Sequence, residues 1–284
     1  MISAIPTLRA TPVESYSEQG RTILVKREDL CAPDGAPPFS KIRGLLAHLS
    51  QLRAEGVTTV GYVETSISMA GWGVAWACEQ LGLDAVIYDP QYKCTPAVLA
   101  YHRKQWARYP VTLEPIQAGM ARVNWNVARR RLSERYGTQA VLLPLGLPLV
   151  ESITATAAEA ERVAATHQVD VVVVNVGSGT IAAGVWQGLA AAGGVGTVYG
   201  VMGRTGDVER KQRLIERKAG LSRGGLFSTP WEFQLKDPGW QYTAPSTHRC
   251  PFPCHAYYDR KAWQWLCENL DDLDGQVLFW NIGH

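Results

Sequence analysis

The chain has 284 residues, of which 46% are hydrophobic and 19% are charged, and its formal net charge is +2. This composition is typical of a globular protein with one large domain or two modest ones. It lacks the concentrated basic character of a dedicated nucleic-acid-binding domain, and no run of about 18 apolar residues indicates a membrane span.

Short β-branched runs alternate along the chain with longer stretches in which apolar residues recur at helical spacing. The runs predict strands at 22–26, 57–63, 84–89, 111–115, 139–144, 169–176, 196–202 and 276–280. The longer stretches predict helices near 40–55, 70–81, 95–108, 118–136, 151–167, 180–192, 207–219 and 258–270. This alternation predicts an α/β fold in which mainly parallel sheets are flanked by helices.

The length suits two lobes, each with its own sheet, better than a single one. We expect a smaller lobe at 50–148, inserted into a larger lobe that consists of 1–49 and 149–284. The segment "LLPLGLP" at 142–148 is typical of a crossing between lobes. The N-terminal segment lacks the basic and apolar regions of a signal peptide, so we expect a cytoplasmic protein with no membrane partner.

The six cysteines are scattered, which argues against a disulfide framework in a cytosolic protein. Cys250, Cys254 and His255 offer three potential metal ligands in "CPFPCH". No second cysteine pair stands at a zinc spacing, and we therefore expect no metal site.

A lysine opens the first predicted helix, in "PPFSKIRGLL". Ser40 is a suitable N-cap, which makes Lys41 the first helical residue, with Arg43 close behind. The positive end of the helix dipole disfavours cations in the first turn. Lys41 is therefore either solvated or short of its charge, and a lysine with a lowered pKa is a nucleophile that forms imines.

A second motif joins a buried strand to a helix in "VVVVNVGSGTIAAG". Between them stand Gly177, Ser178, Gly179 and Thr180. Free backbone N–H groups at the helix start and two hydroxyls form a cradle for an anion. The spacing is neither the dinucleotide nor the P-loop fingerprint, which favours a single phosphate over a nucleotide tail. The alternative is a tight turn that binds nothing.

Two further stretches carry polar groups beside predicted helices. Thr65, Ser66 and Ser68 form a hydroxyl-rich loop that suits a substrate carboxylate, or that only caps the following helix. Tyr257 and Tyr258 precede a helix in which Asp259 is placed to act as the cap. A tyrosine here is either a general acid or base, a stacking partner for a flat ring, or part of the core.

A lysine, a single-phosphate cradle and a carboxylate-binding loop together suit pyridoxal 5′-phosphate. The order of the motifs resembles the fold type II (tryptophan-synthase-β-like) pyridoxal-phosphate enzymes. Within them it resembles most the group of 1-aminocyclopropane-1-carboxylate deaminase and D-cysteine desulfhydrase. The similar segments are "ILVKREDL" (23–30), "FSKIRGL" (39–45), "TSISMAGWGVAWACEQLGL" (65–83), "VGSGTIAAG" (176–184), "YYDRKAW" (257–263) and "VLFWNIGH" (277–284).

The resemblance implies that Lys41 is the Schiff-base lysine and that Gly177, Ser178, Gly179 and Thr180 hold the phosphate. It also implies that Ser68 contacts the substrate carboxylate and that Tyr258 acts at the ring or the substrate. Members of this family are commonly dimers, so we expect a homodimer.

Two positions depart from the family pattern. Met69 takes the cofactor-binding position at which the family has an asparagine, and a thioether is a poor hydrogen-bond partner. Ile282 falls where a serine or threonine meets the ring nitrogen, and the neighbouring Asn281 offers an amide to the cofactor instead.

Three functions are compatible with these residues. The first is a lyase, deaminase or decarboxylase that acts on a small amino acid or related amine through Lys41. In the second, the amine is carried on a modified base in DNA, as in enzymes that tailor hypermodified bases in phage DNA. Basic and aromatic residues interleaved at 101–110, 121–137 and 208–218 could bind such a polyanion, although solvated helix faces explain them equally well. In the third, the chain is a degenerate homologue that binds a ligand without turnover.

Overall fold

The computed structural model describes residues 8–93, 97–221 and 230–284. The chain divides into two compact units. The first comprises Met1–Leu8, Pro33–Pro37 and Leu45–Pro148, and the second comprises Arg9–Ala32, Pro38–Gly44 and Leu149–His284. No helix in the described ranges is long and apolar enough to cross a bilayer.

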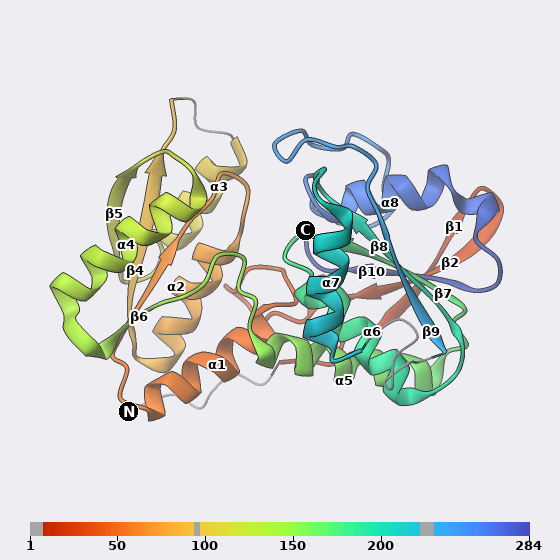
Figure 1. Cartoon of the computed structure of the whole chain (residues 1–284), viewed down its shortest axis with the longest axis horizontal. Helices are drawn as coiled ribbons and strands as arrows, with labels where there is room; N and C mark the ends of the chain where they lie inside the picture. The colour runs from red at the N-terminus through yellow and green to blue at the C-terminus, as the bar shows by residue number, and fades with distance from the viewer. Residues whose placement is uncertain (1–7, 94–96, 222–229) are drawn as a thin grey trace. The chain divides into compact units, whose positions relative to one another are not determined.

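Strands and helices alternate along most of the chain (Figure 1). The strands are β1 (Val13–Glu18), β2 (Arg21–Arg27), β3 (Thr59–Val63), β4 (Asp84–Gln91), β5 (Val111–Gln117), β6 (Ala140–Leu142), β7 (Val171–Val176), β8 (Gly196–Met202), β9 (Trp231–Lys236) and β10 (Val277–Asn281). The α-helices are α1 (Ile42–Ala54), α2 (Ala70–Leu81), α3 (Ala97–Trp106), α4 (Ala121–Tyr136), α5 (Val150–Thr166), α6 (Thr180–Ala192), α7 (Val208–Ala219) and α8 (Asp259–Glu268). Short 3-10 helices lie at Glu28–Leu30, Gly137–Gln139 and Leu270–Asp272.

The second unit contains a six-stranded sheet in the order β1-β2-β10-β7-β8-β9. All of its strand pairs are parallel except β1 with β2. Strand β7 is buried along its whole length, and its side chains alternate between two cores. Val172 and Val174 pack with residues of α5, α6 and α7, whereas Val171 and Val173 pack with residues of α8. Helices therefore cover both faces of this sheet (Figure 1).

The first unit contains a four-stranded, all-parallel sheet in the order β5-β4-β3-β6. Val86 and Tyr88 of β4 pack against Ala128 and Leu132 of α4. The predicted α/β fold class, with mainly parallel sheets flanked by helices, is confirmed.

Most predicted elements are present, but two strands were missed. Both β1, with the sequence VESYSE, and β9, with WEFQLK, lie at the edges of the six-stranded sheet. The predicted helix at 95–108 is α3, and its first two residues lie outside the described ranges.

The start of the first helix also differs from the prediction. Helix α1 begins at Ile42, so Lys41 precedes it. The Ser40 hydroxyl, expected as the cap, is buried and has no hydrogen-bond partner in the described part of the chain. Only its backbone carbonyl reaches the helix, where it accepts the Arg43 N–H at 3.1 Å.

Four buried charges fix the backbone around this helix start. Lys26 of β2 donates to Glu159 of α5 at 2.7 Å. Arg43 of α1 lies 2.9 Å from Glu28 and 3.2 Å from Glu159. Both carboxylates are fully buried and Lys26 is 2% exposed, so each charge depends on its partners for compensation. Through Arg43, the segment that carries Lys41 is therefore attached by ion pairs to the 3-10 helix Glu28–Leu30 and to α5.

We predict that Glu159→Gln lowers the free energy of unfolding by about 3 kcal/mol, because Lys26 and Arg43 would lose a buried counter-charge. Urea denaturation followed by circular dichroism measures the change. The matched control is Glu161→Gln on the exposed side of the same helix, which should alter stability by less than about 0.5 kcal/mol. Equal losses in the two variants would show that the buried network is not a special source of stability.

Candidate active site

The structure brings Lys41 to the glycine-rich turn between β7 and α6. The Lys41 amine (Nζ) donates to the Ser178 hydroxyl at 3.3 Å, and that hydroxyl lies 2.9 Å from the Thr180 hydroxyl. All three residues belong to the second unit. The predicted lysine and the predicted phosphate cradle are therefore adjacent.

The two glycines of the turn have different roles. Gly179 has a φ of +78°, and a Cβ there would lie 2.6 Å from Ile215 of α7, so both backbone conformation and packing require glycine. A Cβ on Gly177 would meet nothing within 4 Å. The space beside Gly177 is therefore open for a ligand, whereas the shape of the turn depends on Gly179.

Two lysines of α7 hold the turn from outside. Lys218 donates to the Ser178 carbonyl at 2.7 Å and to the Thr180 hydroxyl at 3.1 Å. Lys211 donates to the Gly177 carbonyl at 2.8 Å. With Lys41, these residues place three ammonium groups around a turn whose backbone is ready to receive an anion.

Like charges meet at this turn. The pKa of Lys41 is lowered to about 8, mainly by burial and then by the nearby charge of Lys218, while Asp259 acts in the opposite direction. Burial, followed by the charge of Lys211, lowers the pKa of Lys218 to about 8 as well. Near neutral pH an appreciable share of the Lys41 amine is therefore uncharged and nucleophilic.

Asp259 is a buried carboxyl whose charge raises the pKa of Lys41. Its side-chain contact differs from that of the expected helix cap. It is the first residue of α8 and its side chain accepts the Ile282 N–H at 3.0 Å. Burial raises the pKa of Asp259 well above its ordinary value. A buried carboxyl of this kind can face a protonated ring nitrogen, which is a common arrangement in pyridoxal-phosphate sites.

Asn281, at the end of β10, uses its amide donors within the protein. They reach Asp29 at 2.9 Å and the Pro253 carbonyl at 2.9 Å. The Asn281 side-chain oxygen is buried without a partner among the described residues. Its predicted contact with the cofactor stays a prediction.

The two predicted tyrosines lie just before α8. The Tyr258 hydroxyl is 2.9 Å from the Tyr242 hydroxyl, and its carbonyl accepts from Asn175 at the end of β7 at 3.0 Å. The ring of Tyr257 lies 5.9 Å from that of His255. Tyr258 is thus attached to the strand end that leads into Gly177–Thr180, the predicted phosphate turn, which suits the predicted role at the ring or substrate.

Thr65, Ser66, Ser68 and Met69 form one loop between β3 and α2 in the first unit. Glu64 lies beneath this loop and accepts the backbone N–H groups of Thr65 and Gly71, each at 2.7 Å. Burial raises the pKa of Glu64 to about 8. This carboxyl supports the loop from one side, while the Ser68 hydroxyl accepts the Ala70 N–H at 3.0 Å.

Four charged residues at the glycine-rich turn and the hydroxyl loop were not predicted as site residues from the sequence: Glu64, Lys211, Lys218 and Asp259. Lys211 and Lys218 lie in the basic stretch 208–218, and the sequence does not show that their side chains point toward the glycine-rich turn. No group of three or more potential metal ligands occurs in the described ranges, where Cys250 and Cys254 are free thiols.

We predict that Lys41 reacts with an amine-specific reagent with a midpoint near pH 8, because only the neutral amine reacts and burial lowers its pKa from 10.5. Mass spectrometry of the Lys41 peptide after brief labelling across pH gives the midpoint. Lys218→Gln should move the midpoint to higher pH, since it removes a nearby positive charge. Lys104→Gln, at an exposed position of α3, should leave it in place. A midpoint above 10 in the unaltered protein would contradict this.

The chain is similar to several known proteins. Residues 4–221 match the family model described as "Pyridoxal-phosphate dependent enzyme". The chain is 42% identical to the glycyl-dTMP PLP-dependent decarboxylase of Pseudomonas phage M6, over 96% of this chain and 98% of that protein.

Solved structures agree on the fold. An ACC deaminase homologue superposes with a TM-score of 0.76 at 20% identity, covering 99% of this chain and 91% of that one. Diaminopropionate ammonia lyase from Escherichia coli superposes with a TM-score of 0.64 at 18% identity, covering 99% and 86%. The fold is that of the tryptophan-synthase-β-like group, and the family match extends over Lys41, the loop that holds Thr65 to Met69, and the glycine-rich turn. The chain belongs to the pyridoxal-phosphate-dependent enzymes of fold type II.

Proposed function

We propose that this enzyme decarboxylates an amino acid carried on a thymidylate nucleotide. The observation that supports this most directly is the 42% identity, along nearly the whole chain, to the phage glycyl-dTMP decarboxylase. The deaminase and lyase structures are 20% identical or less and support the fold alone. The modified-DNA alternative drawn from the sequence is therefore better supported than a small free amino acid as substrate.

The residues at the phosphate turn fit the cofactor. The Lys41 amine, whose pKa is lowered, stands beside a turn with two hydroxyls, two further ammonium groups and an open position at Gly177. Lys41 would attach the aldehyde, and Gly177 to Thr180, together with Lys218, would hold the phosphate. Asp259 would face the ring nitrogen in place of the serine or threonine that Ile282 replaces.

Pyridoxal phosphate, when bound, condenses with amines and accepts the electron pair left behind when a carboxylate departs as CO2. The protein must then deliver a proton to the substrate α-carbon. The Lys41 amine, with a pKa of about 8, holds a proton near neutral pH and is suited to this transfer. The Tyr258 hydroxyl, bonded to Tyr242, is a second donor of suitable chemistry.

In this proposal the hydroxyl loop binds the carboxylate that leaves. Ser68 is the main contact, and Thr65 and Ser66 complete the loop. Met69 at the start of α2 is a poor hydrogen-bond partner. Cofactor binding would therefore depend more on Lys41 and the phosphate turn than it does in relatives that have an asparagine at this position.

We predict that the protein with pyridoxal phosphate removes one CO2 from glycyl-dTMP, detected as the mass change of the nucleotide. Lys41→Arg should abolish turnover, with a loss of at least about 10³-fold, because the guanidinium keeps the charge but neither condenses with aldehydes nor returns a proton. Lys104→Gln is the matched control and should retain full activity. Release of ammonia without CO2 would show that the enzyme is a deaminase and not a decarboxylase. A cofactor absorption spectrum that does not change when the nucleotide is added would favour a homologue that binds without turnover.

We predict that Asp259→Asn lowers kcat by roughly 10²-fold, because an amide cannot stabilise a charged ring nitrogen. The variant should still bind the cofactor, since its phosphate is held elsewhere, and its absorption spectrum should shift. If kcat and the spectrum did not change, Asp259 would have no role at the cofactor, and its only function would be to accept the Ile282 N–H.

A further inference from the structure

The proposed substrate is a thymidylate, which in DNA is flanked by further phosphates. One surface of the second unit is physically joined to the phosphate turn and carries excess positive charge. It consists of α7 and the loop before it. Helix α7 contains five Lys or Arg residues and two Glu residues, and its two inward lysines donate to carbonyls of the turn.

Four arginines of this segment are exposed. Three of them, Arg204, Arg210 and Arg217, have no ion pair in the described part of the chain. Arg213 differs, because it lies 3.4 Å from Glu209 on the same helix. We call Arg204, Arg210 and Arg217 the arginine row.

The acidic groups of the segment are already engaged. Asp207 caps α7 by accepting the Arg210 N–H at 2.9 Å. Asp237 accepts from the Thr205 hydroxyl and the Gly206 N–H at 2.8 and 3.0 Å. Both carboxylates therefore hydrogen-bond to neutral groups, and neither forms an ion pair with the arginine row in the described part of the chain.

Charges of the arginine row lower the pKa of the nearest lysine at the turn, and that lysine acts on the next one. The pKa of Lys211 is lowered mainly by burial, and then by the charges of Arg204 and Arg210. Lys211 in turn lowers the pKa of Lys218, and Lys218 lowers that of Lys41. A single cofactor phosphate at the turn would compensate the inner lysines and leave the outer arginines in excess.

Arg204 is also paired with an aromatic ring on a well-anchored loop. Its guanidinium lies 6.0 Å from the centre of the Tyr242 ring. Lys261, which is 2% exposed, donates to the carbonyls of Gly203 and Gln241 at 2.8 and 2.7 Å and so ties the two loops together. Flat aromatic and guanidinium groups are the usual stacking partners of unpaired bases.

We propose that the arginine row binds the sugar–phosphate backbone of single-stranded or locally opened DNA, with Arg204 and Tyr242 against a base beside the one that reacts. This rests on the proposed function. From Arg210 to Arg217 the helix rises about 10 Å, which is the axial length of about three nucleotides of one strand. Many enzymes that modify a base take it out of the stack into a closed pocket or act on a single strand, and an unpaired strand therefore suits a buried reactive amine as partner.

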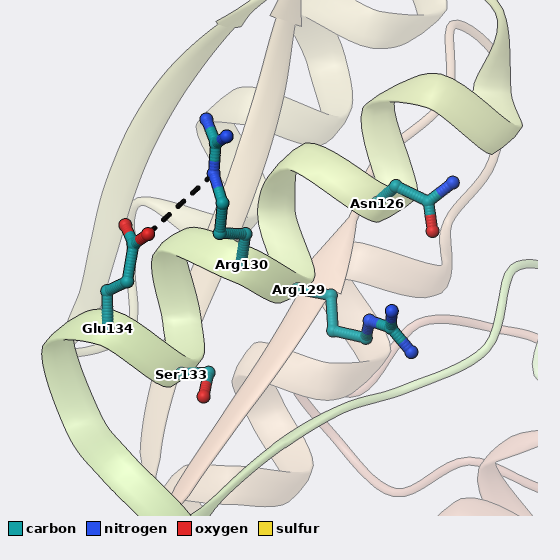
Figure 2. Close-up of a pocket in the computed structure, with 5 residues that line it drawn as sticks. All are labelled: Asn126, Arg129, Arg130, Ser133 and Glu134. Carbon is teal, nitrogen blue, oxygen red and sulfur yellow. Dashed lines mark ion pairs between the residues drawn. The ribbon is translucent and has the colours of Figure 1, made fainter.

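The other basic helix of the chain provides a matched control. The exposed face of α4 has a shallow hollow lined by Asn126, Arg129, Arg130, Ser133 and Glu134 (Figure 2). There Arg130 lies 3.8 Å from Glu134, and the Arg129 guanidinium lies 5.3 Å from the Trp125 ring. It belongs to the first unit, whereas the arginine row belongs to the second.

The test measures binding of a short, fluorescent, thymine-containing single strand to the holoenzyme by anisotropy at several salt concentrations. The double variant Arg210→Gln with Arg217→Gln should weaken binding at least about tenfold. It should also reduce the slope of log affinity against log salt by about 1.4, as expected for two lost phosphate contacts on a single strand. The α4 double variant Arg122→Gln with Arg129→Gln loses the same charge and should change neither quantity by more than about twofold.

Decarboxylation measured in the same variants separates this inference from the proposed function. The arginine-row variant should raise KM for a glycyl-thymine oligonucleotide at least about tenfold and leave kcat nearly unchanged. Equal effects of the α4 and α7 variants, or competition by dTMP as strong as by the oligonucleotide, would overturn the docking surface while decarboxylation stands. Salt-sensitive binding that requires the arginine row, without any CO2 release, would instead retain the surface and overturn the proposed reaction.

Discussion

The buried ion pairs among Lys26, Glu28, Arg43 and Glu159 are the constraint on which the active site depends. They join a strand, a 3-10 helix and two α-helices at one place, and Lys41 lies two residues from one of them. Buried charges tolerate little displacement, because each ion loses its compensation as soon as its partner moves. The reactive amine is thereby held at the phosphate turn by residues that take no part in the chemistry.

The same unit contains a second electrostatic arrangement of the opposite kind. Around the turn, Lys211 lowers the pKa of Lys218, and Lys218 lowers that of Lys41. In the first arrangement cations face carboxylates, whereas in the second ammonium groups repel one another. An anion bound at the turn would relieve that repulsion.

Much of the fold and part of the site could be predicted from the sequence. The apolar run before Gly177 predicts a buried strand and a turn, and the structure adds the 3.3 Å contact from Lys41, 137 residues away. The edge strands β1 and β9 were missed because a strand with one free edge keeps polar residues and resembles a loop. Asp259 was interpreted as a helix cap, because nothing local shows that the N–H of Ile282 lies within reach. The inward direction of Lys211 and Lys218 likewise depends on how α7 packs, which no local pattern records.

The contrast between Gly177 and Gly179 has a consequence for how this enzyme can change over generations. Substitution of Gly179 is opposed by the folded chain itself, because its backbone is left-handed and Ile215 occupies the space of a side chain. Substitution of Gly177 meets no such resistance, and Lys211 and Lys218 hold the turn through carbonyls that any residue possesses. Selection at position 177 therefore acts only through the ligand. A descendant that abandoned its cofactor would be free to lose this glycine first, while the turn around it kept its shape.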